Sequence, residues 1–307
     1  MSLSRIQNDP GADGLKTIRY WLLAIRPKTL SVAVAPVLVG TVLAWVDTGA
    51  VAWSVAATAL LAAVLIQAGT NLHNDAADFE RGADRPGARL GPPRAAAEGW
   101  LTAAQVHRGA VVSFGLAFIL GIYLVWVGGW PIVVIGLASI AAGAAYTGGP
   151  RPIAYSSLGE VFVWLFFGLI AVAGSYYLQT GRLSAAALAA GALLGMPAAA
   201  VLVVNNYRDL DSDRQVGKIT LAVRLGRRAS RMEYALLMLA PFALLPLLRQ
   251  SEGYGWLLPV LLLPWGIVLV RRFWTQQPGP VFNALLAATA QFQLLFGLLL
   301  GVGLLLF

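Results

Sequence analysis

The sequence predicts an all-α integral membrane protein whose nine transmembrane helices form one bundle. Of its 307 residues, 58% are hydrophobic and 12% are charged, whereas soluble domains average about 45–50% and about 25%. Nine separate apolar runs approach or exceed the length of about 20 residues that a spanning helix needs. The Lys and Arg residues are concentrated in alternate connections between these runs. Together, these observations exclude a soluble globular enzyme.

The first 20 residues are expected to form a polar N-terminal segment, and residues 21–307 a single transmembrane domain. The N-terminal segment lacks the apolar core of a secretory signal, so the first spanning helix should direct insertion. Gly and Pro mark several of the short connections, as is typical of helix ends. The nine predicted spans are residues 21–46, 51–72, 106–127, 130–146, 158–178, 185–204, 232–248, 255–270 and 282–307.

The positions of the basic residues predict the orientation. Of the 22 Lys and Arg residues, only Arg182 and Arg249 lie in the connections on the opposite side from the N-terminus. Cytoplasmic loops carry the excess of Lys and Arg, so the N-terminus is expected to be cytoplasmic. The long loops after spans two and six should then form a polar cap that faces the cytosol. We expect a multi-pass protein of the bacterial cytoplasmic (inner) membrane, surrounded by membrane lipids.

Composition also excludes several kinds of site. The chain has no cysteine, which removes disulfides, thiolate metal sites and cysteine nucleophiles. Its two histidines are too few for a histidine-rich metal site. The net charge is +8, but no basic stripe with interleaved aromatic residues is present, so no nucleic-acid partner is expected.

Most of the 14 acidic residues lie in the two long loops. Asp75 and Asp78 are three residues apart, and Asp209 and Asp213 are four apart, so each pair shares one face if the preceding helix continues. Four such carboxylates would repel one another without a cation between them. Mg²⁺ prefers oxygen ligands and often binds a few carboxylates together with substrate phosphates. These four aspartates are therefore the predicted magnesium ligands.

Amides and cations surround the carboxylates and complete a predicted diphosphate site. Arginine and lysine bind phosphate oxygens that the metal leaves free. Beside a deep apolar bundle, such a site suits a substrate with an anionic head and a long hydrocarbon tail, as in a prenyl diphosphate. Loss of diphosphate would leave an allylic cation, which a dry cavity protects from water. The predicted diphosphate-binding residues are Asn71, Asn74, Asn206, Arg208 and Lys218.

Two long segments carry a family resemblance. Residues 71–84 read NLHNDAADFERGAD and residues 205–226 read NNYRDLDSDRQVGKITLAVRLG. They resemble the two aspartate-rich motifs of the UbiA superfamily of intramembrane prenyltransferases. Residues 26–41 (RPKTLSVAVAPVLVGT) and 146–160 (YTGGPRPIAYSSLGE) are similar to one branch, the 1,4-dihydroxy-2-naphthoate polyprenyltransferases of menaquinone synthesis. The resemblance extends from about residue 26 to residue 226.

The resemblance implies a magnesium-dependent enzyme. It would transfer a polyprenyl chain from polyprenyl diphosphate to 1,4-dihydroxy-2-naphthoate, with loss of CO₂ and diphosphate, to give demethylmenaquinone. The family pattern assigns Asp75 with Asp78 to one magnesium ion, and Asp209 with Asp213 to the other. Many relatives have a third aspartate seven residues after the first. That position is Gly82 here, and Asp84 is the candidate substitute, as a ligand or as a proton acceptor.

The acceptor site is less closely defined by sequence. The naphthoate carries a carboxylate, which Arg94 or Arg151 would orient, and Tyr146 is a further candidate residue of the acceptor site. Another aromatic acceptor, 4-hydroxybenzoate or homogentisate, remains an alternative because pocket shape decides this choice. A secondary transporter is the alternative from another class. It would need charges inside the membrane, and Glu160 is the acidic residue nearest to such a position.

Overall fold

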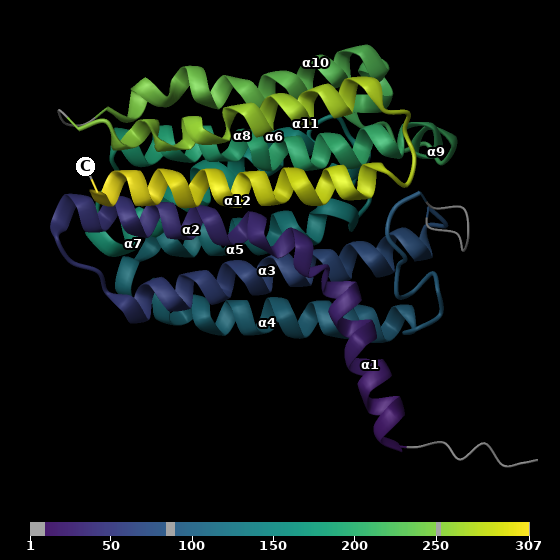
Figure 1. Cartoon of the computed structure of the whole chain (residues 1–307). Helices are drawn as coiled ribbons and strands as arrows, with labels where there is room; N and C mark the ends of the chain where they lie inside the picture. The colour runs from purple at the N-terminus through teal and green to yellow at the C-terminus, as the bar shows by residue number, and fades with distance from the viewer. Residues whose placement is uncertain (1–9, 84–89, 250–252, 307) are drawn as a thin grey trace, which may run out of the picture.

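The computed structural model describes residues 10–83, 90–249 and 253–306, and these residues form helices and the turns between them. The long helices run side by side along one axis, and the loop after α3, the short helix α9 and the helix α1 lie at the same end of the bundle (Figure 1). The helices are α1 (Pro10–Ile25), α2 (Pro27–Thr48), α3 (Trp53–Glu80), α4 (Ala103–Gly128), α5 (Trp130–Thr147), α6 (Gly159–Trp164), α7 (Ala171–Thr180), α8 (Ala185–Arg208), α9 (Leu210–Gln215), α10 (Leu221–Leu244), α11 (Leu263–Thr275) and α12 (Phe282–Leu306).

Shorter turns join some of these helices into longer rods. The 3₁₀ turn η1 (Ile153–Tyr155) precedes α6, and the π-helical segment η2 (Leu165–Ile170) connects α6 to α7. Two further 3₁₀ segments, η3 (Leu245–Leu248) and η4 (Gly255–Leu262), extend α10 and α11. With these joins, nine segments of the described chain are long and apolar enough to cross a membrane. The predicted all-helical architecture with nine spans is confirmed, whereas the cytoplasmic position of the N-terminus and of the cap stays a prediction.

The first span begins later than the sequence pattern suggests. Instead of running on from Trp21, the helix stops at Arg26, whose φ of 58° is left-handed, and α2 starts at Pro27. The residue before a proline is disfavoured in the right-handed helical region, which explains the break. The apolar end of α1 packs on the loop after α3 instead, where the ring of Tyr20 stacks on Trp100 at 5.2 Å between centroids.

Two helices extend beyond their apolar runs and carry the aspartate-rich motifs. Helix α3 continues through Asp75 and Asp78, which are 1% and 6% exposed. Helix α8 ends at Arg208, and Asp209 lies between it and the short helix α9, as the N-cap of α9. The amide of Asp213 donates to the carbonyl of Asp209 at 2.8 Å, so the second pair keeps its one-turn spacing across the break.

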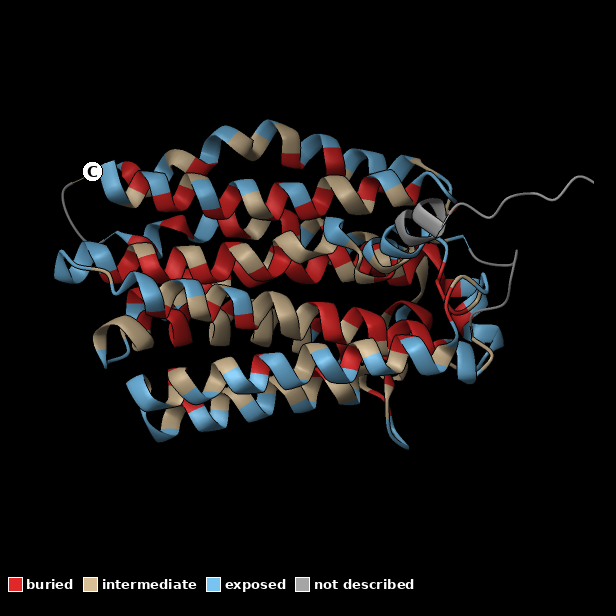
Figure 2. Cartoon of the chain, turned by 90° about the horizontal axis from the view of Figure 1, so that it is seen from below, coloured by how far each residue is buried: buried red, intermediate tan, exposed pale blue. Residues whose placement is uncertain are grey.

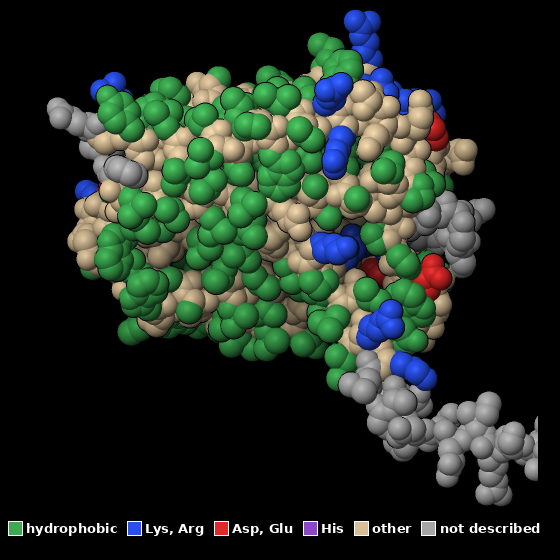
Figure 3. All heavy atoms as spheres, in the orientation of Figure 1, with side chains coloured by type: hydrophobic (Ala, Val, Ile, Leu, Met, Phe, Trp, Pro, Cys, Tyr) green, Lys and Arg blue, Asp and Glu red, His purple; other side chains and the backbone are tan. Residues whose placement is uncertain are grey.

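The bundle is buried at its centre and apolar on its outside. Figure 2 shows buried residues along the inward faces of the helices, and α8 is the most buried of the spanning segments. Large side chains such as Trp126 and Trp130 are exposed on the outside. On the face seen in Figure 3, apolar side chains cover most of the bundle, and Lys and Arg gather toward the end that carries the loops. This surface suits contact with lipid tails and headgroups.

Candidate active site

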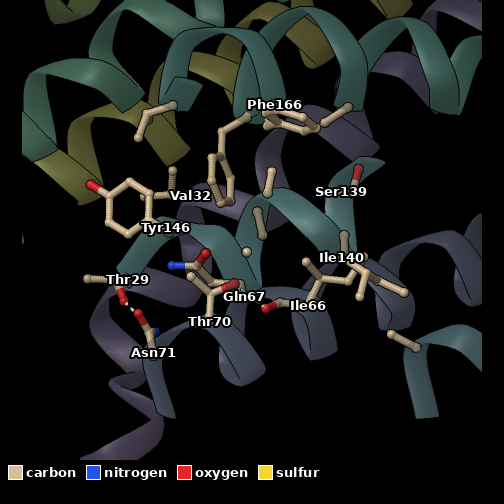
Figure 4. Close-up of a pocket in the computed structure, with 18 of the residues that line it drawn as sticks. Thr29, Val32, Ile66, Gln67, Thr70, Asn71, Ser139, Ile140, Tyr146 and Phe166 are labelled. Carbon is tan, nitrogen blue, oxygen red and sulfur yellow. Dashed lines mark hydrogen bonds between the residues drawn. The ribbon is translucent and has the colours of Figure 1, made fainter. Parts of the chain in front are cut away.

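The helices surround a cavity of about 820 Å³ whose lining extends to the end of the bundle that carries the long loops. Figure 4 shows labelled side chains from α2, α3, α5 and η2 around it. Most of its wall is apolar, so it can hold a hydrocarbon chain away from water. Residues of this apolar wall include Ala59, Ala62, Ile66, Phe118, Ile140, Phe162, Phe166, Phe167, Ala198 and Val201.

Both aspartate-rich motifs contribute to the polar end of this cavity. From the first motif and its following loop come Asn71, Asn74, Asp78 and Arg94; from the second come Asn205, Asn206 and Lys218. Tyr146 of α5 lies at the same end of the cavity. Segments far apart in sequence therefore meet at the head of one apolar cavity, as the sequence predicts for a diphosphate and its tail.

Tyr155 links the two motifs. Its hydroxyl donates to Asp78 Oδ1 at 3.2 Å, while Asp78 Oδ2 lies 3.5 Å from Arg94 Nη2. Lys218 Nζ lies 5.7 Å from the centre of the Tyr155 ring and 3.4 Å from Asp213 Oδ1. Burial raises the pKa of the Tyr155 hydroxyl above its usual value, so it remains a proton donor. No spacing or motif in the sequence predicts this bridge.

Asp213 is placed to receive a cation. Burial raises the pKa of its carboxyl to about 6, the charges of Asp209 and Asp78 act in the same direction, and Lys218 lowers it. Its Oδ2 atom is buried and accepts no hydrogen bond from any described residue. Lys218 pairs with Oδ1, so Oδ2 is the carboxylate oxygen left for a further partner, and a bound metal ion would provide one.

Asp209 and Arg208 form a buried pair at the end of α8. The guanidinium donates to both carboxylate oxygens through Nε and Nη2. It also donates to Asn283 Oδ1 at 2.7 Å and to Asn205 Oδ1 at 2.8 Å. Arg208 is 1% exposed and fastens α8 to α12. Its predicted contact with a diphosphate and the predicted metal ligation by Asp209 stay predictions.

Asp75 faces the loop rather than the cavity. Its two oxygens accept hydrogen bonds from the backbone amides of Ala95 and Ala96, at 2.9 and 3.0 Å. The carboxylate therefore holds the turn that carries Arg94 in place. Metal ligation by Asp75 stays a prediction. In the described chain, no group of three His, Asp or Glu side chains is close enough to hold a metal ion by itself.

The remaining predicted residues divide between cavity and surface. Arg94 is 6% exposed and lines the cavity, as does Tyr146. Arg151 is exposed and is not among the residues that line the cavity. Asp84 lies outside the described residues. Of the two cations considered for the acceptor carboxylate, Arg94 is the one at the cavity.

The hydrogen bonds of two asparagines orient their amides. Asn71 Nδ2 donates to the carbonyl of Ile25 at 2.8 Å and to Thr29 Oγ1 at 3.2 Å, and Figure 4 shows the second of these bonds. Asn74 Oδ1 accepts from the Thr147 hydroxyl at 2.7 Å. The side-chain oxygen of Asn71 and the NH₂ group of Asn74 are therefore left for a ligand.

The cavity also includes polar residues that sequence reasoning missed. Arg26, Thr29 and Gln67 line it. Gln67 precedes Asn71 by four residues, so the periodicity of a helix already places the two on one face. Arg26 carried no such signal, because its position depends on the break before α2.

Comparison with known proteins supports the family resemblance. A sequence profile of the UbiA prenyltransferase family matches residues 33–295. The 1,4-dihydroxy-2-naphthoate octaprenyltransferase of Escherichia coli (strain K12) is 37% identical over 293 residues, covering 92% of this chain and 94% of that protein. The protein of the same name from Mycobacterium tuberculosis is 38% identical over 221 residues, covering 72% and 74%. That of Bacillus subtilis is 32% identical, covering 93% and 91%.

Solved structures share the fold at low sequence identity. A UbiA homolog from Archaeoglobus fulgidus bound to DMAPP and Mg²⁺ has a TM-score of 0.68 and 15% identity, covering 94% of this chain and 99% of that chain. The same homolog bound to GPP and Mg²⁺ has a TM-score of 0.65. These findings favour the predicted prenyltransferase over a secondary transporter. With nine helices of spanning length among its described residues and a profile match over most of its length, the chain belongs to the UbiA prenyltransferase family.

Proposed function

We propose that this protein transfers a polyprenyl chain from polyprenyl diphosphate to 1,4-dihydroxy-2-naphthoate, with loss of CO₂ and diphosphate, to give demethylmenaquinol, the reduced form of demethylmenaquinone. The names of the bacterial relatives support this acceptor. The observation that carries the proposal is a cavity whose apolar wall leads to a polar end built from both aspartate-rich motifs. Such a cavity matches a lipid-like tail joined to a diphosphate.

The residues present fit a magnesium ion held together with the substrate. The related A. fulgidus structures contain Mg²⁺ with a prenyl diphosphate, and Mg²⁺ usually needs only one or two carboxylates when phosphates and waters supply the other ligands. Asp213 has a buried oxygen without a donor, and Asp78 lines the cavity. Asp75 and Asp209, the other predicted ligands, would first exchange their present partners. When bound, Mg²⁺ would offset the negative charge on the leaving diphosphate.

The chain's own residues bind and orient the two substrates. Lys218 supplies a cation near Asp213 for the phosphate oxygens, and Asn74 offers an NH₂ group to them. Arg94, at the same end, is placed to orient the carboxylate of the acceptor. The apolar wall would exclude water while the allylic carbon–oxygen bond breaks and the ring carbon attacks. The acceptor carboxylate then leaves as CO₂.

The proposed function also implies where the protein lies in the cell. We place the protein in the bacterial cytoplasmic membrane with the polar end of the cavity toward the cytoplasm. The distribution of Lys and Arg supports this orientation. In this orientation the prenyl chain can enter the cavity from the lipid, and the water-soluble acceptor can enter it from the cytoplasm.

A product assay tests the function. Purified protein in detergent or vesicles is incubated with polyprenyl diphosphate, Mg²⁺ and one acceptor: 1,4-dihydroxy-2-naphthoate labelled in its carboxylate, 4-hydroxybenzoate, or homogentisate. Mass spectrometry follows the prenylated product, and trapping follows the labelled CO₂. We expect product and CO₂ in equal amounts with the naphthoate, and neither when EDTA removes the metal. Turnover with 4-hydroxybenzoate but not with the naphthoate would contradict the assignment.

A further inference from the structure

Glu160 is a buried acid that the proposed chemistry has not used. It lies in the first turn of α6, inside a segment that is long and apolar enough to span the membrane, and is 5% exposed. Its Oε1 atom accepts a hydrogen bond from Asn206 Nδ2 at 2.7 Å. No donor among the described residues reaches its Oε2 atom. A carboxyl group is costly in such a place and usually marks a functional site.

The partner of Glu160 faces the cavity. Asn206 is 4% exposed and lines the cavity at its polar end, as Tyr146 does. A Cβ atom built on Gly159 would lie 3.6 Å from the Tyr146 hydroxyl, so the start of α6 lies directly beside this tyrosine. Asn206 and Tyr146 therefore share one corner of the cavity, and Glu160 contacts this corner through Asn206.

Glu160 determines which end of the Asn206 amide a ligand meets. The NH₂ group is engaged by the Glu160 carboxyl, which leaves the carbonyl oxygen Oδ1 as the free end of the amide. Within the described chain, no hydrogen bond to this oxygen is formed. A carboxylate behind the NH₂ group also polarises the amide and strengthens Oδ1 as an acceptor, because linked hydrogen bonds reinforce one another.

The chemistry of the two substrates decides which of them this oxygen suits. An ionised diphosphate offers oxygen acceptors and no donor, so it gains nothing from a carbonyl oxygen. A ring hydroxyl of an aromatic acceptor is a donor. Its hydrogen bond also strengthens during the reaction, because the hydroxyl oxygen becomes more positive as the ring carbon attacks the prenyl chain. The sequence-based role of Asn206 at the diphosphate requires a donor that Glu160 already occupies.

We propose that Asn206 Oδ1 accepts a hydrogen bond from a ring hydroxyl of the aromatic acceptor, and that Glu160 is the positioning residue that fixes and polarises the Asn206 amide. This inference rests on the proposed function, because it requires an aromatic acceptor with a hydroxyl group. It adds no covalent step, and it assigns the α6–α8 corner of the cavity to the acceptor rather than to the diphosphate.

Reversing the hydrogen bond provides the sharpest test. The single variant N206D places two carboxyl groups in contact, and we expect kcat/KM for the acceptor to fall about 10- to 100-fold, the range for a lost hydrogen bond to a charged group. The variant E160L frees the Asn206 amide to rotate, and we expect kcat/KM for the acceptor to fall by a similar factor. In the double variant E160Q/N206D, the glutamine amide can donate to the new carboxylate, whose other oxygen again faces the cavity. We expect this double variant to recover to within about fivefold of the wild type.

Substrate-resolved measurements separate this role from a structural one. The KM for polyprenyl diphosphate should stay unchanged in all variants, and so should the dependence on Mg²⁺. The Kd of the naphthoate, measured by calorimetry with a non-reactive prenyl thiodiphosphate present, should rise in N206D and E160L and recover in the double variant. Melting temperatures report folding. D47N, which removes another acid from a spanning segment outside the cavity lining, is the matched control and should behave as wild type.

Two outcomes would overturn the inference. One is a folded double variant that stays as inactive as N206D. The other is a loss that appears in the diphosphate KM or in the Mg²⁺ requirement, since Asn206 would then serve the diphosphate or the metal. Failure of the proposed function looks different: the wild-type protein itself would give no product with the naphthoate.

Discussion

Asp213 combines two properties that suit a metal ligand: a buried oxygen without a donor and a carboxyl pKa raised to about 6. Burial is the main cause, and the neighbouring carboxylates add to it. Protons therefore compete with a cation for this group near neutral pH. Above about pH 6 the carboxyl is ionised and can bind Mg²⁺, and below it the proton must first be displaced.

This competition predicts a pH-dependent magnesium affinity. The Kd for Mg²⁺, measured by calorimetry with a prenyl thiodiphosphate bound, should be nearly constant from pH 7 to 8 and rise up to about tenfold for each pH unit below 6. Asp213→Asn should bind Mg²⁺ weakly at every pH and lose this dependence. An affinity that stays flat down to pH 5 in the wild-type protein would show that Asp213 does not titrate with metal binding.

The two aspartates of α3 are expected to respond differently to substitution. The Asp75 carboxylate accepts hydrogen bonds from two backbone amides of the following loop. Asp75→Asn should therefore destabilise the protein by about 1–3 kcal/mol, and lower both the melting temperature and turnover. Asp78 lines the cavity and accepts a hydrogen bond from Tyr155. An asparagine oxygen can still accept this bond, so Asp78→Asn should abolish turnover and lower the melting temperature less than Asp75→Asn does. Differential scanning fluorimetry and the product assay together distinguish the two. Equal melting temperatures for both variants would contradict a loop-holding role for Asp75.

At the scale of helices, close contacts between backbones position the cavity wall. Gly168 of η2 packs against α8, and a Cβ atom built on it would lie 2.5 Å from the Gly191 carbonyl oxygen. This contact fixes the π-helical turn that carries Phe166 and Phe167 at the cavity. Such π-helical turns occur frequently at functional sites.

A small substitution at this contact should therefore separate the helices. Gly168→Ala is expected to destabilise the protein by about 1–3 kcal/mol, the range for overpacking in a filled interior, and to reduce turnover. The matched control is Gly115→Ala in α4, where a Cβ atom meets nothing within 4 Å. Thermal unfolding in detergent gives the comparison. Similar melting temperatures for the two variants would mean that η2 and α8 can separate without cost.

For the whole molecule, the basic end of the bundle predicts its orientation in the membrane. Because the chain has no cysteine, single cysteines can be introduced and labelled without background. Gln215 lies at the end of α9 beside the loops, and the exposed Leu183 lies in the connection before α8, on the opposite side. In intact cells, a membrane-impermeant maleimide should label Leu183→Cys and not Gln215→Cys. The reverse pattern would place the polar end of the cavity outside the cytoplasm.

Local patterns in the sequence were sufficient for the architecture. The hydrophobic runs predicted nine spans, because each spanning helix must form its own backbone hydrogen bonds and present apolar side chains to lipid. The aspartate spacing placed Asp75 and Asp78 on a continuing helix, which the structure confirms. The break at Arg26 and the late start of α2 were missed, since the apolar residues before it appeared continuous with the span.

The partners of the site residues were decided by the tertiary structure. Sequence treated Asp75 and Asp78 as equivalent, and Arg94 and Arg151 likewise, whereas the fold turns Asp75 to a loop and leaves Arg151 at the surface. It also brought Glu160 against Asn206 from another helix. The composition and spacing of a chain determine which segments span a membrane, because those forces act within one segment. Which oxygen remains free for a substrate depends on contacts between distant segments, and only the packed bundle fixes those contacts.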